Sequence, residues 1–193
     1  MAGVLVDRAG LPRCRRCNLR EVACFCRSIR SLHLPFEVHL LAHPLELKRP
    51  SSSVLFLQLD SQVKLHTYQR TQLLTPEIGD VLLYPKTNDP LPVDTDTNPS
   101  KDTNIRRLWL LDGTWQETTK MLANQPLLAR LPRLSIACRS SRYPFRKNQR
   151  MGGLSTAEAL LASVDDSYSQ HRESYYDEYL AHAVASMNGH APC

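Results

Sequence analysis

The chain has 193 residues, 42% of them hydrophobic, and a formal net charge of +5. This length suits one domain with its own core and a small additional segment. The sequence has no run of about 18 apolar residues, so no membrane span is expected. Met1–Gly10 lacks the apolar core of a secretory signal, so we expect a cytoplasmic protein.

One long stretch of the chain carries basic residues and no acids. Seven of them fall between residues 130 and 150, and no acid lies between Glu117 and Glu158. From Glu158 onward the chain carries six acids and only Arg172 as a base. A basic stretch followed by an acidic one is typical of a protein that binds a polyanion such as RNA, although ordinary surface charge explains the pattern equally well.

The first 31 residues form a segment rich in cysteine and arginine and poor in aliphatic side chains. Such a segment needs a covalent or metal cross-link to hold its shape. Its cysteines, spaced C-x2-C-x6-C-x-C, suit tetrahedral Zn²⁺, whereas two disulfides are disfavoured in a cytosolic chain. We therefore predict a structural zinc site in residues 1–31 and one further domain over residues 32–193, with an iron–sulfur cluster or redox cysteines as the alternatives. The predicted ligands are Cys14, Cys17, Cys24 and Cys26.

Strand and helix patterns alternate along the rest of the chain. Short apolar or alternating runs predict strands, and two capping-box sequences, at Thr114–Glu117 and Ser155–Glu158, predict helix starts. Strands are expected at 36–41, 63–68, 81–84, 108–111 and 134–138, helices at 54–59, 115–124 and 156–187 with a break at 167–172, and an exposed loop at 88–104. This alternation predicts an α/β sheet with helices on both faces.

Three polar corners directly follow predicted strands, namely His43-Pro44, Tyr84-Pro85 and Asp112-Gly113-Thr114. Ligands of α/β sheets bind outside the carboxyl ends of the strands, so these corners are expected to meet at one site. A carboxylate held rigidly at a strand end can accept a proton, and partial burial raises the pKa of such a group. Asp112 is therefore a candidate general base, with support of the turn as the alternative role.

Asp112-x-Thr114-Trp115 resembles the signature of the DTW-domain proteins, the tRNA-uridine aminocarboxypropyltransferases. The other motifs of that family occur in the expected order: the four cysteines, His43-Pro44-x-Glu46, Tyr84-Pro85, Ser141-Arg142-Tyr143-x-x-Arg146 and Leu154-Ser155-Thr156-x-Glu158-Ala159. The chain departs from the family after the His-Pro-x-Glu motif, where a serine run, 51–53, replaces the usual Asn-Thr.

The resemblance implies a SPOUT-like knotted fold that binds S-adenosylmethionine. It implies transfer of the 3-amino-3-carboxypropyl group to N3 of a uridine in tRNA, with release of methylthioadenosine, and no obligate protein partner is expected. The motifs and the resemblance together give the predicted donor-binding residues as Leu83, Tyr84, Pro85, Leu111, Thr114, Trp115, Ser155 and Thr156. The predicted substrate-binding residues are His43, Glu46, Arg142, Tyr143 and Arg146.

Two other functions fit the same sequence: a SPOUT-type RNA methyltransferase that uses the same donor, and a zinc-ribbon RNA-binding protein without catalysis. Structural roles also stay open for several site residues. Thr114 and Ser155 can serve only as helix caps, Trp115 as a core residue, His43 as a structural histidine and Arg142 as ordinary surface charge.

Overall fold

The computed structural model describes residues 5–49, 52–85, 105–136, 140–145, 153–164 and 167–192. Within these ranges the chain forms a five-stranded parallel sheet in the order β2-β1-β4-β3-β5. The strands are β1 (Glu37–Ala42), β2 (Val63–Thr67), β3 (Asp80–Leu83), β4 (Arg107–Asp112) and β5 (Arg133–Leu134). The predicted α/β class is confirmed, and the SPOUT-like knot stays a prediction.

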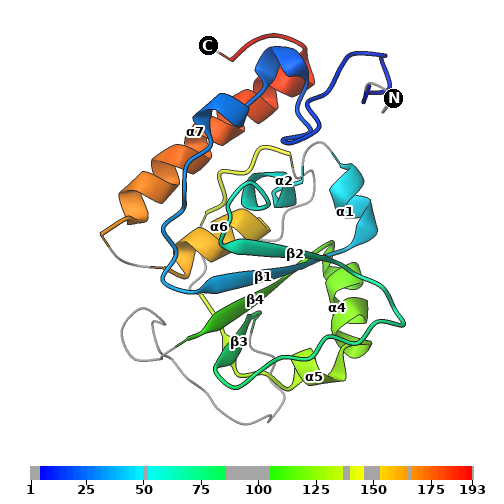
Figure 1. Ribbon diagram of the computed structural model, residues 1–193, viewed down its shortest axis with the longest axis vertical. Coiled ribbons are helices and arrows are strands. Elements are labelled where there is room, and N and C mark those ends of the chain that lie inside the picture. The colour runs from blue at the N-terminus through cyan, green and yellow to red at the C-terminus, as the bar shows by residue number, and fades with distance from the viewer. Residues whose placement is uncertain are drawn as a thin grey trace.

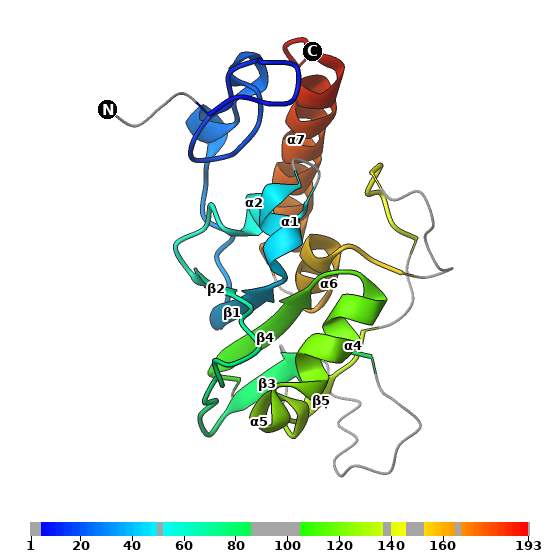
Figure 2. The ribbon, with the colours of Figure 1, turned by 90° about the vertical axis from the view of Figure 1, so that its right-hand side faces the viewer.

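Helices cover both faces of this sheet (Figures 1 and 2). One face carries α2 (Val54–Leu57), α6 (Thr156–Ala162) and α7 (Ser169–Asn188), and the other carries α4 (Trp115–Ala123) and α5 (Pro126–Ala129). Successive side chains of a strand point to opposite faces. Leu40 and Leu110 therefore enter the core beneath α6 and α7, whereas Leu41 and Leu111 enter a smaller cluster beneath α4.

The carboxyl ends of β1 and β4 coincide, because Ala42 and Asp112 are register partners. The backbone N–H of His43 donates to the carbonyl of Asp112 at 2.8 Å, and α1 (Pro44–Lys48) begins directly after this contact. β3 lies on the other side of β4, so its end at Leu83 opens onto the same edge. The three polar corners predicted to meet there do so.

Both predicted capping boxes are present. Thr114 caps α4 and Ser155 caps α6, each with the glutamate three residues later completing the reciprocal bond. The predicted division of the C-terminal helix into two is confirmed, because α6 ends at Ala162 and α7 begins at Ser169. The break lies a few residues earlier than the predicted 167–172, and residues 169–172 form the first turn of α7. Arg172 is accommodated there, fully buried, since its guanidinium donates to the carbonyls of Leu32 and His33 at 2.7 Å.

Other predicted element ends also differ. α2 ends at Leu57 rather than residue 59, and Ser53 at its N-terminus forms no side-chain cap. β5 is limited to two residues, while 137–139 lie outside the described residues, as does the loop expected at 88–104.

The N-terminal segment contains two short 3₁₀ turns, η1 (Glu21–Ala23) and η2 (Cys26–Ser28), and packs along α7 (Figure 1). The ring of Phe25 stacks against Tyr175 and meets Tyr179 edge to face. The segment thus shares the main core with the buried rings of Tyr175, Tyr176 and Tyr179, whereas Tyr168 is half exposed. None of the described helices is long and apolar enough to cross a bilayer.

Candidate functional site

A cavity of about 290 Å³ lies at the carboxyl ends of β3 and β4. Aliphatic and aromatic side chains predominate in its walls, among them Leu83, Tyr84, Leu110, Trp115, Leu134 and Ile136. The rings of Tyr84 and Trp115 meet edge to face with their centroids 6.2 Å apart. Apolar walls with a few polar groups at the end suit a flat aromatic ligand that carries a polar arm.

Six of the eight predicted donor-binding residues line this cavity: Leu83, Tyr84, Pro85, Leu111, Trp115 and Thr156. Trp115 is 40% exposed, so the alternative of a core tryptophan is wrong. The side chains of Thr114 and Ser155 act as helix caps, and the Ser155 hydroxyl also contacts the Tyr176 hydroxyl at 3.2 Å. Thr156 is therefore the hydroxyl of the Ser155-Thr156 pair that faces the cavity.

The carboxylate of Asp112 lies directly behind the cavity wall. Asp112 is 5% exposed, whereas its chain neighbours Leu111 and Gly113 both line the cavity. One carboxylate oxygen accepts a hydrogen bond from the Thr156 hydroxyl, and the other accepts one from Ser52 at 3.3 Å. Asp112 is thus fixed from two sides at the strand end.

A second carboxylate, that of Glu46, lies near Asp112 and is also buried. Burial raises the pKa of Glu46 and the negative charge of Asp112 raises it further, while Arg49 and the Ser52 hydroxyl act in the opposite direction. Perturbed carboxyl pairs of this kind are frequent in functional sites. Ser52 therefore interacts with both carboxylates.

His43 caps α1, and its Nδ1 accepts a hydrogen bond from the backbone N–H of Leu45 at 3.4 Å. The same nitrogen lies 3.5 Å from the Glu117 carboxylate. Burial raises the pKa of Glu117, but the hydrogen bonds from the Thr114 backbone N–H and hydroxyl outweigh it, so the net pKa is lowered. His43 thus has a structural role whether or not it also contacts a substrate.

His43 and Glu117 also border another cavity, of about 460 Å³, together with Tyr68, Arg70 and Lys120. The rings of Tyr68 and His43 stack with their centroids 6.3 Å apart. Sequence reasoning missed this cavity and missed Ser52. The only available signal was the serine run at the position where the family has Asn-Thr.

Of the predicted substrate-binding residues, Arg142 and Tyr143 contact other parts of the protein. Arg142 forms an ion pair with Asp177 of α7 at 2.9 Å, and its backbone N–H donates to Glu158. The ring of Tyr143 packs edge to face on Phe145. Arg146 lies outside the described residues. A ligand role for Arg142, Tyr143 and Arg146 therefore stays a prediction.

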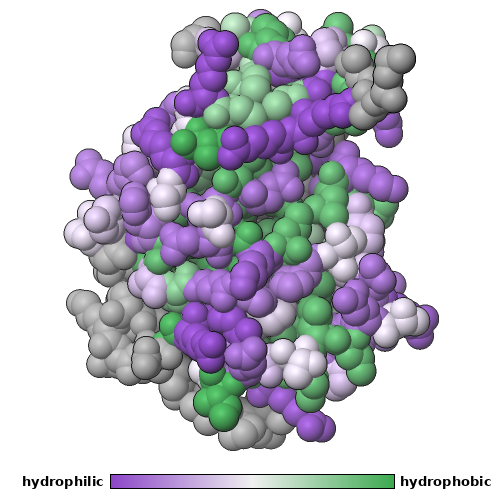
Figure 3. All heavy atoms as spheres, in the orientation of Figure 1, coloured by the Kyte–Doolittle hydropathy of each residue, from purple (hydrophilic) through white to green (hydrophobic). Residues whose placement is uncertain are grey.

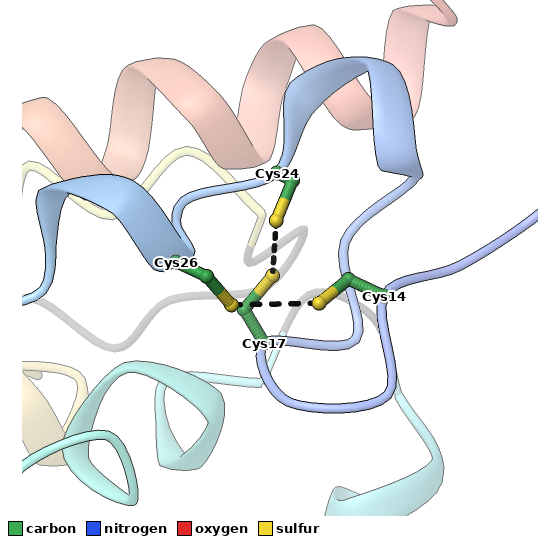
Figure 4. Close-up of side chains that lie close together, drawn as sticks. All are labelled: Cys14, Cys17, Cys24 and Cys26. Atoms are coloured by element: carbon green, nitrogen blue, oxygen red, sulfur yellow. Dashed lines mark hydrogen bonds between the residues drawn. The ribbon is translucent and has the colours of Figure 1, made fainter.

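The four N-terminal cysteines converge on one point (Figure 4). Their sulfur atoms all lie within 4.8 Å of one another, with 3.8 Å between Cys17 and Cys24 and 3.4 Å between Cys14 and Cys26. Zn–S bonds of about 2.3 Å in a tetrahedron separate the sulfurs by about 3.8 Å, so the residues fit Zn²⁺. Burial opposes ionisation of Cys14, but hydrogen bonds from the backbone N–H groups of Cys17 and Arg16 help to lower its pKa to about 7.

A family model for the DTW domain matches residues 11–187 of this chain. The chain belongs to the DTW-domain family. One curated relative, the tRNA-uridine aminocarboxypropyltransferase 2 of Drosophila melanogaster, is 30% identical over 168 residues. That match covers 76% of this chain and 62% of the relative, so the chain spans less than two thirds of the relative's length. No solved structure matches the chain.

The DTW match includes every part of the site described above. It begins before Cys14, and it extends through β1, β4 and α6 to the last turn of α7. In this DTW domain the name-giving residues have distinct tasks, because Asp112 lies behind the cavity wall, Thr114 caps α4 and Trp115 lines the cavity.

Proposed function

We propose that this protein transfers the 3-amino-3-carboxypropyl group of S-adenosylmethionine to N3 of a uridine in tRNA. The observation that carries the proposal is the position of Asp112, a carboxylate fixed by Ser52 and Thr156 directly behind an apolar cavity. Membership of the DTW family and similarity to the Drosophila tRNA-uridine aminocarboxypropyltransferase 2 support transfer of this group to a uridine in tRNA.

The donor occupies the cavity beside Tyr84 and Trp115. These aromatic rings and the aliphatic walls suit the adenine ring. The sulfonium of the donor activates the carbon atoms bonded to it. Thr156 and Gly113 line the cavity, and both adjoin Asp112: Thr156 through a hydrogen bond and Gly113 as the next residue in the chain. The reacting end of the donor is therefore directed toward the carboxylate.

The acceptor nitrogen of uridine carries a proton and is a poor nucleophile until that proton leaves. Asp112 accepts this proton while N3 attacks the carbon bonded to sulfur. The new N–C bond forms as the C–S bond breaks. The electron pair of the C–S bond returns to sulfur, so the leaving group is neutral methylthioadenosine. Ser52 and Thr156 are positioning residues, because their hydroxyls orient the carboxylate.

The same proposal includes the parts of the molecule that surround this site. The domain adopts the SPOUT-like knotted form, binds tRNA in the cytoplasm, and holds one structural Zn²⁺ at the four cysteines. A closed site of four cysteines leaves no open coordination position, so the metal supports the fold and takes no part in the transfer.

Mass spectrometry of nucleosides tests the proposal after the protein is incubated with unmodified tRNA and S-adenosylmethionine. A uridine that gains one aminocarboxypropyl group, with methylthioadenosine released, is the expected result. A methyl gain with S-adenosylhomocysteine would overturn the reaction but keep the donor. If the donor neither reacts nor raises the melting temperature of the protein, the enzyme proposal fails as a whole.

A further inference from the structure

A second, larger groove lies at the end of α1 that is remote from Asp112. It measures about 950 Å³ and is lined on one side by the N-terminal segment and on the other by the ends of α1 and α2. Six arginines and one lysine line it, against a single carboxylate, that of Asp7. Hydrophilic and apolar side chains are mixed over the N-terminal segment at the top of the molecule (Figure 3).

Two of these arginines are held in place by short-range contacts. Arg20 donates to Asp7 at 2.7 Å, and Arg13 lies 3.8 Å from the same carboxylate while donating to the carbonyl of Asn18 at 2.6 Å. Asn18 adopts a left-handed conformation, with φ of 57°, and closes the turn that begins at Cys14. The wall of the groove is therefore ordered before any ligand arrives, which lowers the entropic cost of binding.

Three further cations of the groove, Arg8, Arg16 and Lys48, are exposed. Within the described parts of the chain, no carboxylate pairs with Arg8, Arg16 or Lys48. Clustered charge of one sign that the protein does not neutralise attracts a counter-charge from outside. Because arginine presents a planar fork of donors that matches phosphate, an arginine-rich groove favours phosphodiester groups over isolated carboxylates.

Helix α1 connects this groove to the candidate active site. It spans five residues, about 7.5 Å at 1.5 Å per residue. Its first residue follows His43, whose backbone N–H donates a hydrogen bond to the carbonyl of Asp112. Its last turn contributes Lys48 to the groove. Arg49 lines the groove and also forms an ion pair with Glu46, whose pKa is raised by the charge of Asp112. A polyanion bound in the groove is thus one short helix away from the reacting groups.

We propose that this groove binds the phosphodiester backbone of an RNA and that the N-terminal segment is the platform that holds the acceptor at Asp112. The identification of this RNA as the tRNA acceptor rests on the proposed function, whereas the binding itself does not. The groove is concave and combines its cations with the apolar side chains of Leu47, Leu55 and Leu65, which favours a folded polynucleotide over the flat surface of a bilayer.

The test is a salt titration of binding between the full protein and fluorescent unmodified tRNA, without donor. The triple variant Arg8→Gln, Arg16→Gln, Lys48→Gln removes three groove charges. Each lost phosphate contact lowers the slope of log affinity against log salt by about 0.7 to 0.9. We therefore expect a slope reduced by about two to three and an affinity weakened about tenfold or more in 0.1 M salt. All three residues are exposed, so folding should be little affected.

A control variant removes the same number of charges elsewhere. The variant Arg106→Gln, Arg130→Gln, Lys64→Gln changes two arginines and one lysine that are not among the groove residues. Arg106 and Lys64 are paired with Glu77 and Glu37, whereas Arg130 is exposed. The variant should keep the wild-type slope. Equal slopes for the groove and control variants would overturn the proposal. So would a groove variant that loses binding to phosphatidylserine vesicles but keeps its tRNA affinity, because the groove would then serve a membrane surface.

Turnover separates this proposal from the proposed function. If the groove variant raises the KM for tRNA and leaves kcat nearly unchanged, both proposals are supported. If tRNA binds through the groove but no modified nucleoside forms, the groove stands and the reaction fails. If modified uridine forms with an unchanged KM in the groove variant, the reaction stands and the groove proposal is overturned.

Discussion

The hydroxyl of Ser52 donates a 3.3 Å hydrogen bond to the carboxylate of Asp112, sixty positions further along the chain. This bond connects the segment between α1 and α2 to the end of β4. Together with the bond from Thr156, it means that the segment between α1 and α2 and the start of α6 both fix the same carboxylate. The carboxylate of Asp112 is therefore oriented by two segments that lie far from it in the sequence.

The first prediction concerns Asp112 itself. Asp112→Asn keeps the shape of the side chain but removes the ability to accept a proton, so turnover should fall by about two orders of magnitude or more. Binding of S-adenosylmethionine, followed by calorimetry, should change little because the cavity walls are untouched. Wild-type turnover in this variant would remove Asp112 from the role of base.

Ser52 provides a second, narrower prediction. Ser52→Ala should lower kcat about tenfold with little change in KM for the donor, because the carboxylate loses one of its two orienting hydroxyls. Loss of a donor to a carboxylate favours its neutral form, so the acid limb of the pH–rate profile should move to higher pH. Ser52→Thr keeps the hydroxyl and should restore most of the activity. A profile that does not move in Ser52→Ala would assign Ser52 to packing alone.

The strands and helix starts of this fold are predictable from sequence for local reasons. Leu40 and Leu110 belong to continuous apolar runs, as expected of parallel strands buried on both faces. The capping boxes at Thr114 and Ser155 depend only on residues three positions apart. The carboxyl-edge location of the site follows from the order of strands and turns.

The contacts that define the site are not predictable in the same way, because they join distant segments. The bonds of Ser52 and Thr156 to Asp112 follow no sequence period. The basic stretch that predicts polyanion binding in the sequence is also not the one that forms the basic groove. The acid-free basic stretch lies between 130 and 150, but its member Arg142 is paired with an acid of α7. The basic groove instead combines residues near Arg16 with Lys48.

Donor binding should be visible through tryptophan fluorescence. The chain has two tryptophans, and Trp109 is buried in the cluster beneath α4, whereas Trp115 lines the cavity. S-adenosylmethionine should therefore change the emission of Trp115 alone. Trp115→Ala should remove this change and weaken donor binding about tenfold to a hundredfold, the usual effect of losing a stacking ring. An unchanged signal in Trp115→Ala would place the donor elsewhere.

Glu46 should make stability depend on pH. Its pKa is raised above the unfolded value of 4.5 by burial and by the charge of Asp112. A carboxyl whose pKa rises on folding contributes stability at low pH that is lost as the pH rises from 4.5 through the folded pKa. Glu46→Gln is neutral throughout, so the wild type should lose free energy of unfolding relative to this variant across that window. Urea unfolding at several pH values measures the difference.

The exposed Glu173 on α7 provides the control for this measurement. Glu173→Gln removes the same charge from a half-exposed position, so the wild type should show no comparable pH-dependent loss relative to it. A constant difference between the wild type and Glu46→Gln at all pH values would contradict the assigned direction.

The two helix caps should differ in their contribution to stability. Thr114→Ala removes an exposed cap and should cost about 1 kcal/mol, which lowers the melting temperature by about 2–4 °C for a chain of this size. Ser155→Ala should cost more, because Ser155 is buried and its loss also removes a partner of the Tyr176 hydroxyl. Equal melting temperatures for the two variants would show that the buried contact adds nothing.

Metal removal should affect the N-terminal segment first. The four sulfurs are close enough for one Zn²⁺, so a chelator should release about one zinc per chain. Hydrogen exchange should then increase between residues 11 and 28 and in the part of α7 that contacts Phe25, since that ring joins the segment to Tyr175 and Tyr179. Cys17→Ser should reproduce the effect, whereas Cys193→Ser, outside the C-x2-C-x6-C-x-C spacing, should not. If the protein contains iron in place of zinc, the four cysteines hold a different kind of metal site. A metal-free protein with unchanged hydrogen-exchange protection would refute the prediction of a metal site.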